Sequence, residues 1–199
     1  MEKFKNKYRI PSARLQNWDY SNEGAYFITI CTQNRAHFFG EIKDGIMTLS
    51  NVGVIANLMW FEIKNHAKVV ELGEFIVMPN HVHGILILND MDKVQNDGPD
   101  VETRHALSLH PHQPQNQLTP PPNTGQSRFQ NQGKNSVSSI IGSYKSAVTK
   151  HANRLGFEFG WQDRFHDHII KNAESFETIQ TYIANNPLKW KEDKFFLDE

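Results

Sequence analysis

Cysteine is almost absent from this chain, since Cys31 is the only one in 199 residues. A single cysteine forms no internal disulfide and excludes a zinc site built from several cysteines. Long hydrophobic runs are absent too, because no stretch approaches the roughly 20 apolar residues of a membrane span. The basic start, MEKFKNKYRIPSARL, also has no apolar segment typical of a signal peptide. We therefore expect a cytoplasmic protein with no membrane partner.

The chain also lacks a strong excess of charge of one sign, since its formal net charge is −1. Lysine and arginine nevertheless gather in two segments. Residues 1–16 hold five of them against one acid, and residues 134–172 hold six against three acids. Such local patches can bind a phosphate backbone although the whole chain is neutral. Solvated helix faces give the same pattern, so charge alone leaves both interpretations open.

Apolar residues are scarce in one stretch, residues 90–133, which is rich in Gln, Asn, Pro and Gly. Such a composition cannot bury enough surface to fold by itself, so we expect a flexible polar insertion. The remaining chain is long enough for one ordinary hydrophobic core. We therefore expect a single domain over residues 1–199 that carries this insertion.

Hydrophobic periodicity predicts strands first and helices around and after the insertion. We expect a strand over 24–34, a hairpin over 38–50 with its turn at Asp44-Gly45, a helix over 50–68, strands over 69–80 and 81–88, a helix over 136–157, a short strand over 164–172, and a helix over 172–190. The apolar stripe of the helix over 50–68 is predicted to be Val54, Leu58, Trp60, Phe61 and Ile63. That of the helix over 136–157 is predicted to be Ile140, Ile141, Tyr144, Val148 and Leu155. This order favours an α+β fold with a mainly antiparallel sheet and helices on one face.

Two histidines stand in the apolar strand HVHGILIL. His81 and His83 are two residues apart and should project from one face, whereas Val82 points the other way. Paired neutral imidazoles can form half of a metal site, although two hydrogen-bonded histidines at a strand end are the plain alternative. His166 and His168 have the same spacing, and spacing alone does not distinguish the two pairs.

Further ligands could come from the last helix. Tyr182 and Asn186 are four residues apart and share a helix face if the helix continues through Asn186, which the following Pro187 disfavours. A metal held by two histidines and an amide oxygen would polarise a phosphate beside the tyrosine hydroxyl. By spacing alone, the simpler interpretation is that Tyr182 packs on the sheet and Asn186 caps the helix.

The segments MPNHVHGI, WQDRFHDHIIKN and YIANNPLKW, in this order, resemble the single-tyrosine HUH transposases and, among them, the REP-associated tyrosine transposases. HUH denotes histidine, a hydrophobic residue and histidine. The resemblance covers roughly residues 20–90 and 135–192. It implies a ferredoxin-like (RRM-like) antiparallel sheet, the HUH endonuclease fold. It also implies an enzyme that cuts and rejoins single-stranded DNA at or near hairpins of palindromic repeats, as a monomer or a homodimer.

Carried over to this sequence, the resemblance assigns roles to individual residues. His81 and His83 would bind Mg²⁺ or Mn²⁺ with Asn186 as third ligand. Tyr182 would attack the phosphodiester and form a 5′-phosphotyrosine. His168 falls outside the HUH motif, which settles the choice between the histidine pairs.

Other residues are candidates for DNA contacts. We expect phosphate contacts from Lys145, Lys150 and Arg164, and stacking on an unpaired base or hairpin tip from Trp161 and Phe165, although both aromatics could equally be buried. Tyr144 is interpreted as a core or interface residue. Two other functions remain open: a catalytically silent hairpin-binding protein of the same fold, and a metal-independent phosphodiesterase in which the histidines act as acid and base.

Overall fold

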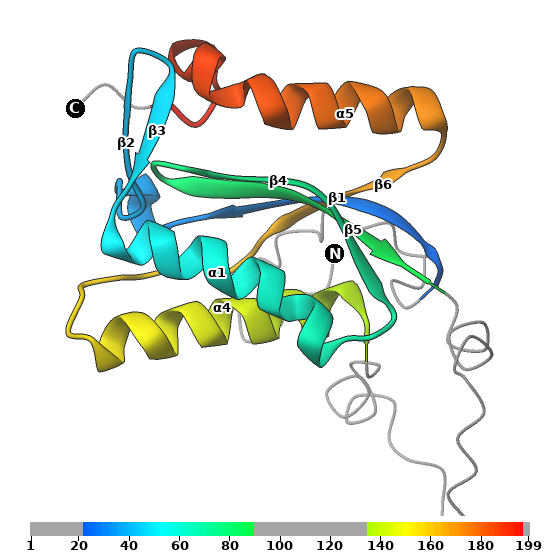
Figure 1. Ribbon diagram of the computed structural model, residues 1–199, viewed down its shortest axis with the longest axis horizontal. Coiled ribbons are helices and arrows are strands. Elements are labelled where there is room, and N and C mark those ends of the chain that lie inside the picture. Colours follow the sequence, from blue (N-terminus) through cyan, green and yellow to red (C-terminus); the bar gives the residue numbers. More distant parts are fainter. Residues whose placement is uncertain (1–21, 90–134, 197–199) are drawn as a thin grey trace, which may run out of the picture.

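The computed structural model describes residues 22–89 and 135–196, so the predicted insertion at 90–133 and the basic segment 1–16 lie outside the described residues. No helix within these two ranges is both long and apolar enough to cross a membrane. The elements follow the predicted order (Figure 1): β1 (Gly24–Cys31), the short 3-10 helix η1 (Gln33–Arg35), β2 (Gly40–Lys43), β3 (Ile46–Leu49), α1 (Asn51–His66), β4 (Val70–Met78), β5 (His81–Leu88), α4 (Val137–Arg154), β6 (His166–Ile170), α5 (Ala173–Asn185) and the 3-10 helix η2 (Asn186–Glu192).

The main sheet has the strand order β4-β5-β1-β6, and every neighbouring pair is antiparallel. β5 therefore lies inside the sheet, between β4 and β1. β2 and β3 form a separate hairpin, in which Asp44 (φ 52°) and Gly45 (φ 75°) take the left-handed angles that the Asp-Gly signal predicts. The predicted α+β architecture with an antiparallel sheet is confirmed.

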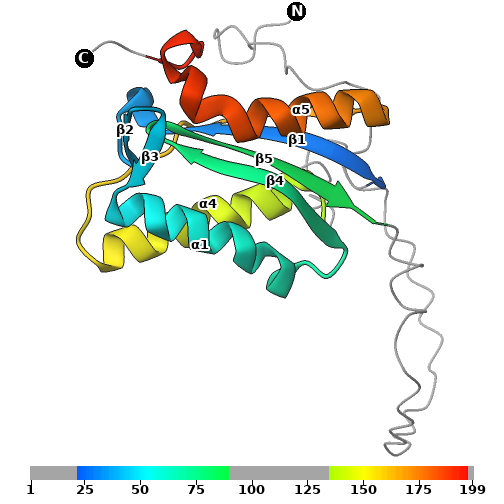
Figure 2. The ribbon, with the colours of Figure 1, turned by 45° about the horizontal axis from the view of Figure 1, so that its top comes forward.

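Helices cover both faces of this sheet (Figures 1 and 2). α1 and α4 lie together on one face, where they pack on Tyr26 and Ile28 of β1. α5 lies across the other face, where Ile183 packs with Ile85 of β5. The prediction that helices cover one face of the sheet thus holds for α1 and α4. It did not include α5, which covers the opposite face. The reason is the run 85–88 (ILIL), which is apolar at successive positions, so both faces of β5 need cover.

The apolar stripe of α1 differs in part from the predicted one. Trp60 is buried as expected, but Val54, Leu58 and Phe61 are exposed. The residues that α1 does bury recur mostly every three or four positions: Val52, Gly53, Ala56, Trp60 and Ile63. The three residues that were predicted to be buried but are exposed lie on a different side of the helix from this face. Leu155, predicted to be in the stripe of α4, is exposed because it follows the last helical residue.

Trp60 depends on a glycine in the strand beneath it. Its ring lies over Gly84 of β5, where an added Cβ would be 2.3 Å from Trp60 Cζ2. The indole also stacks on Phe75 at 4.4 Å between ring centroids and meets Tyr144 edge-on at 5.4 Å. Gly84 follows the histidine pair directly, so this packing fixes β5 from the face opposite to the imidazoles.

Candidate metal and nucleophile site

β5 places His81 and His83 on the face that α5 covers. The strand pairs in register with β1, with Thr29 opposite His83. Because alternate residues share a face, both imidazoles point toward α5, whereas Val82 joins the core under α1 and α4. The two rings are buried, with their centroids 4.4 Å apart. The prediction that they project together is confirmed.

α5 brings Tyr182 and Asn186 to the same place. Asn172 caps its first turn with a side-chain hydrogen bond. Asn186 keeps helical angles (φ −57°, ψ −41°) although Pro187 follows, so Tyr182 and Asn186 do share a helix face. The phenolic oxygen lies 3.2 Å from His83 Nε2. Tyr182 is 39% exposed, so a substrate can reach it. Its ring also packs on the sheet against Phe27 and His83, as the simpler interpretation expects.

A hydrogen-bond chain fixes the protonation of His81. Asn80 Nδ2 donates to the Phe195 carbonyl at 2.8 Å, so Asn80 Oδ1 is the atom that faces His81 Nδ1, also at 2.8 Å. An amide oxygen only accepts, so His81 Nδ1 carries the proton and Nε2 keeps a lone pair. Among the residues that the structure describes, neither that buried Nε2 nor the buried Oδ1 of Asn186 has a hydrogen-bond partner. Two unsatisfied acceptors therefore lie buried within the site.

Both imidazoles are neutral at pH 7. Burial lowers the pKa of His81 well below its ordinary value, and the neighbouring His83 lowers it further. Burial likewise lowers the pKa of His83 to about 4, although the nearby Asp193 carboxylate opposes the shift. Thr29 Oγ1 lies 2.9 Å from His83 Nδ1 and holds that ring in place. Neutral and oriented imidazoles are the form in which histidine binds metals.

Asp193 is a member of the site that the sequence did not reveal. Tyr182 donates its phenolic proton to Asp193 Oδ2 at 3.1 Å, and Asn186 Nδ2 donates to the same oxygen at 3.0 Å. Burial first, and then the Asp193 charge and hydrogen bond, raise the pKa of Tyr182 to about 12. The residue follows the last residue of η2 and stands in the charged run KEDK, where no motif or periodicity marks one acid among several.

These groups fit a divalent cation. Ligand atoms of His81, His83 and Asp193 all lie within 4.8 Å of one another. A cation would also satisfy the buried lone pairs of His81 Nε2 and Asn186 Oδ1, for which residues 22–89 and 135–196 supply no donor. Imidazole nitrogen together with carboxylate and amide oxygen is a common donor set for divalent metals. The rival histidines of β6 are exposed and do not belong to this cluster.

An open cavity of about 600 Å³ lies in front of the tyrosine. It is lined by residues of β1, β5, α5 and the chain after it, including Phe27, His83, Tyr182, Lys189 and Lys194. The ring of Phe27 supports Tyr182 edge-on at 6.1 Å between centroids. Two lysine side chains thus place positive charge beside the phenol, and Glu192 and Asp193 line the same cavity with negative charge.

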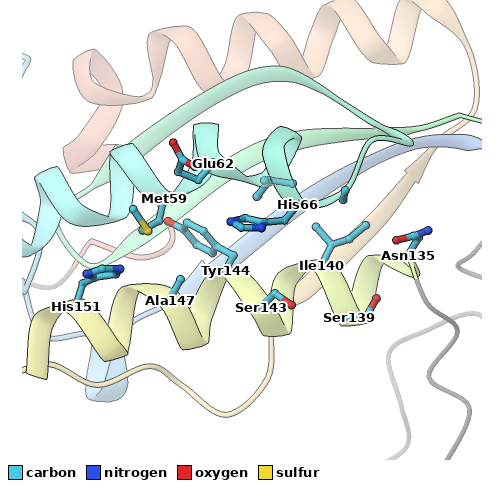
Figure 3. A pocket seen from close by; sticks show the side chains of 12 residues that line it. Met59, Glu62, His66, Asn135, Ser139, Ile140, Ser143, Tyr144, Ala147 and His151 are labelled. Atoms are coloured by element: carbon cyan, nitrogen blue, oxygen red, sulfur yellow. The ribbon is translucent and has the colours of Figure 1, made fainter. Parts of the chain in front are cut away.

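A second cavity, of about 510 Å³, lies between α1 and α4, on the face of the sheet away from the imidazoles (Figure 3). Met59, Glu62 and His66 of α1 face Tyr144 and His151 of α4 across it. The Tyr144 hydroxyl donates to the Ala56 carbonyl at 3.0 Å, and the side chain is buried. The interpretation of Tyr144 as a core residue is confirmed.

The five candidate DNA contacts lie on α4 and the loop after it, and none of them lines the cavity beside the tyrosine. Lys145 Nζ donates to the carbonyls of Gln162 and Asp163, at 2.7 and 3.2 Å, and so holds this loop. Trp161 donates from Nε1 to the Lys145 carbonyl at 3.1 Å and packs against the core. Phe165 packs there too, whereas Lys150 and Arg164 are exposed. Contacts of these residues with DNA stay a prediction.

Comparisons with known proteins agree with this fold. No protein-family model matches the chain. The structure is similar to that of a REP-associated tyrosine transposase bound to a REP hairpin, with a TM-score of 0.51 and 17% identity over 91% of this chain and 77% of that chain. The fold is therefore of the HUH transposase type. An uncharacterized protein of Haemophilus influenzae is 32% identical over 188 residues, 94% of this chain and 93% of its own length. The chain belongs to the same family as this Haemophilus influenzae protein.

Proposed function

We propose that this chain is a metal-dependent transposase that cuts and rejoins single-stranded DNA at or near hairpins. Tyr182 is the nucleophile, and a 5′-phosphotyrosine is the intermediate. One observation carries the proposal: an accessible phenol lies 3.2 Å from one of two neutral, buried imidazoles. The fold likeness to a transposase bound to a DNA hairpin supports the choice of substrate.

His81, His83 and Asn186 would hold the cation, Mg²⁺ or Mn²⁺. Two of them already present unsatisfied acceptor atoms, His81 Nε2 and Asn186 Oδ1. When bound, the cation would polarise the scissile phosphate and offset the charge that develops during attack. Asn80 and Thr29 orient the two rings through their Nδ1 atoms.

Tyr182 supplies the covalent chemistry. As its oxygen attacks phosphorus, the phenolic proton is released to solvent, the bond from phosphorus to the 3′-oxygen breaks, and the leaving 3′-oxygen takes up a proton from solvent. The 5′ end of the downstream strand stays esterified to the phenol, so a 3′-hydroxyl can later attack it and restore a phosphodiester. Lys189 and Lys194 line the cavity beside the phenol and contribute charge for the flanking phosphates.

The test is incubation of the full chain with single-stranded genomic DNA flanking its gene, with Mn²⁺ or with EDTA, followed by denaturing electrophoresis. We expect a covalent adduct with Mn²⁺ that is absent with EDTA and absent from Tyr182→Phe, while Tyr182→Phe still binds the hairpin. Binding without any adduct would instead support the silent hairpin-binding protein. Cleavage that persists in EDTA would support the metal-independent phosphodiesterase.

A further inference from the structure

The C-terminal segment, residues 193–196, is fastened onto the histidine site by contacts from several elements. Arg35 donates to the Lys194 carbonyl at 3.1 Å, and Asn80 donates to the Phe195 carbonyl at 2.8 Å. Phe195 is buried, and its ring centroid lies 4.7 Å from that of His81. The Arg35 guanidinium lies 5.0 Å above the same phenyl ring. The segment therefore forms one wall of the site.

This docking aims the Asp193 carboxylate at the histidines. The Phe195 backbone N–H donates to Asp193 Oδ1 at 2.7 Å, which turns Oδ2 toward the site. Oδ2 accepts from both Tyr182 and Asn186. Because Asn186 donates from Nδ2 to this oxygen, its own Oδ1 is left as the free acceptor. One carboxylate thus lies within the cluster and also orients a neighbouring amide.

We propose that Asp193 is itself a ligand of the cation, so that the metal site is complete only when the C-terminal segment is docked. The inference rests on the proposed function, because it concerns the cation at that site. The ligand atoms of Asp193, His81 and His83 lie within 4.8 Å of one another. Neutral imidazoles and an amide contribute no negative charge, so Asp193 supplies the anionic oxygen that Mg²⁺ and Mn²⁺ favour.

A reciprocal effect follows from this ligation. If docking of residues 193–196 strengthens cation binding, cation binding must stabilise the docked segment by the same factor. Asn80 links the two events, because its amide contacts both His81 Nδ1 and the Phe195 carbonyl. Metal should therefore slow hydrogen exchange at the backbone amides of Phe195 and Phe196, which hydrogen-bond to Asp193.

The experiment is a titration of the full chain with Mn²⁺. Binding is measured by isothermal titration calorimetry and, independently, by the EPR signal of free Mn²⁺. The test variant is Asp193→Asn, which keeps an oxygen for the Phe195 N–H but removes the charge. The control is Glu192→Gln, which removes the same charge from the exposed neighbour. We expect Asp193→Asn to weaken Mn²⁺ binding about tenfold or more, and Glu192→Gln to change it by less than about twofold.

Hydrogen exchange gives a second readout, which does not depend on the measured affinities. Metal-induced protection of residues 193–196, lost in Asp193→Asn, supports ligation. Equal Mn²⁺ affinity of Asp193→Asn and the unmodified chain, with His81→Asn still abolishing binding, overturns the role of Asp193 and leaves the proposed function standing. An unmodified chain that binds no Mn²⁺ overturns both.

Discussion

Acid should destabilise the metal-free protein through His83. Burial lowers the pKa of His83 from 6.5 to about 4 in the folded state, whereas an unfolded chain has the ordinary value. Between these values the unfolded state binds a proton that the folded state does not, so the free energy of unfolding falls as pH falls from about 6.5 to about 4. Above pH 6.5 the group contributes no pH dependence.

The magnitude follows from the shift. One pKa unit corresponds to about 1.4 kcal/mol, so the full loss below pH 4 is about 3 kcal/mol. Between pH 7 and pH 5 the loss from this residue is about 2 kcal/mol. Burial shifts the pKa of His81 in the same direction, so its contribution adds to the loss.

Urea unfolding in EDTA at pH 7 and pH 5 measures this loss. His83→Gln should reduce the difference between the two pH values by about 2 kcal/mol, whereas His168→Gln, at an exposed position of β6, should leave it unchanged. Burial is the larger cause of the His81 shift and persists in His83→Gln, whereas the smaller effect of His83 on His81 is lost with it, so the comparison reports His83 together with that effect. The reasoning is refuted if His83→Gln keeps the full pH dependence of the unmodified chain.

Three further changes test the packing, the ligand orientation and the cavity. Gly84→Ala places a Cβ 2.3 Å from Trp60 Cζ2 and should lower the free energy of unfolding, measured in urea, by about 1–3 kcal/mol. The control Gly142→Ala, whose Cβ has open space around it, should not destabilise the protein, and equal effects of the two substitutions would disprove the packing argument. Asn80→Ala should weaken Mn²⁺ binding about tenfold in calorimetry, and an unchanged affinity would contradict the orienting role. Lys189→Ala should weaken binding of single-stranded DNA and reduce the slope of log binding constant against log salt concentration by about 0.7. An unchanged slope would show that Lys189 does not contact a phosphate.

Local sequence signals specified most of the elements around the site. The alternation in HVHGILIL placed both histidines on one face of β5, because the side-chain period of a strand is two. Four-residue spacing placed Tyr182 and Asn186 together on α5, and the structure shows that Pro187 does not end the helical conformation before Asn186. These relations involve a single element, so they can be read without knowing the fold.

Relations between elements were less predictable. Asp193 reaches the site only because Arg35 and Asn80 hold the segment after η2, and no local pattern encodes such long-range contacts. The side of the sheet on which α5 lies depends on which face of β5 the other helices leave uncovered. The same limit applies to Trp161, whose place against the core depends on aromatic neighbours from distant segments, including Phe39 and Tyr144.

The central claim is that Tyr182 becomes covalently attached to DNA, and peptide mapping of a trapped adduct tests it most directly. Trypsin should release residues 172–189 as one peptide in which Tyr182 is the only tyrosine. After reaction with single-stranded hairpin DNA and Mn²⁺ and nuclease digestion, mass spectrometry should find a nucleotide on this peptide, attached through its 5′-phosphate. A nucleotide attached elsewhere, or DNA cleavage with this peptide unmodified throughout, would contradict the account.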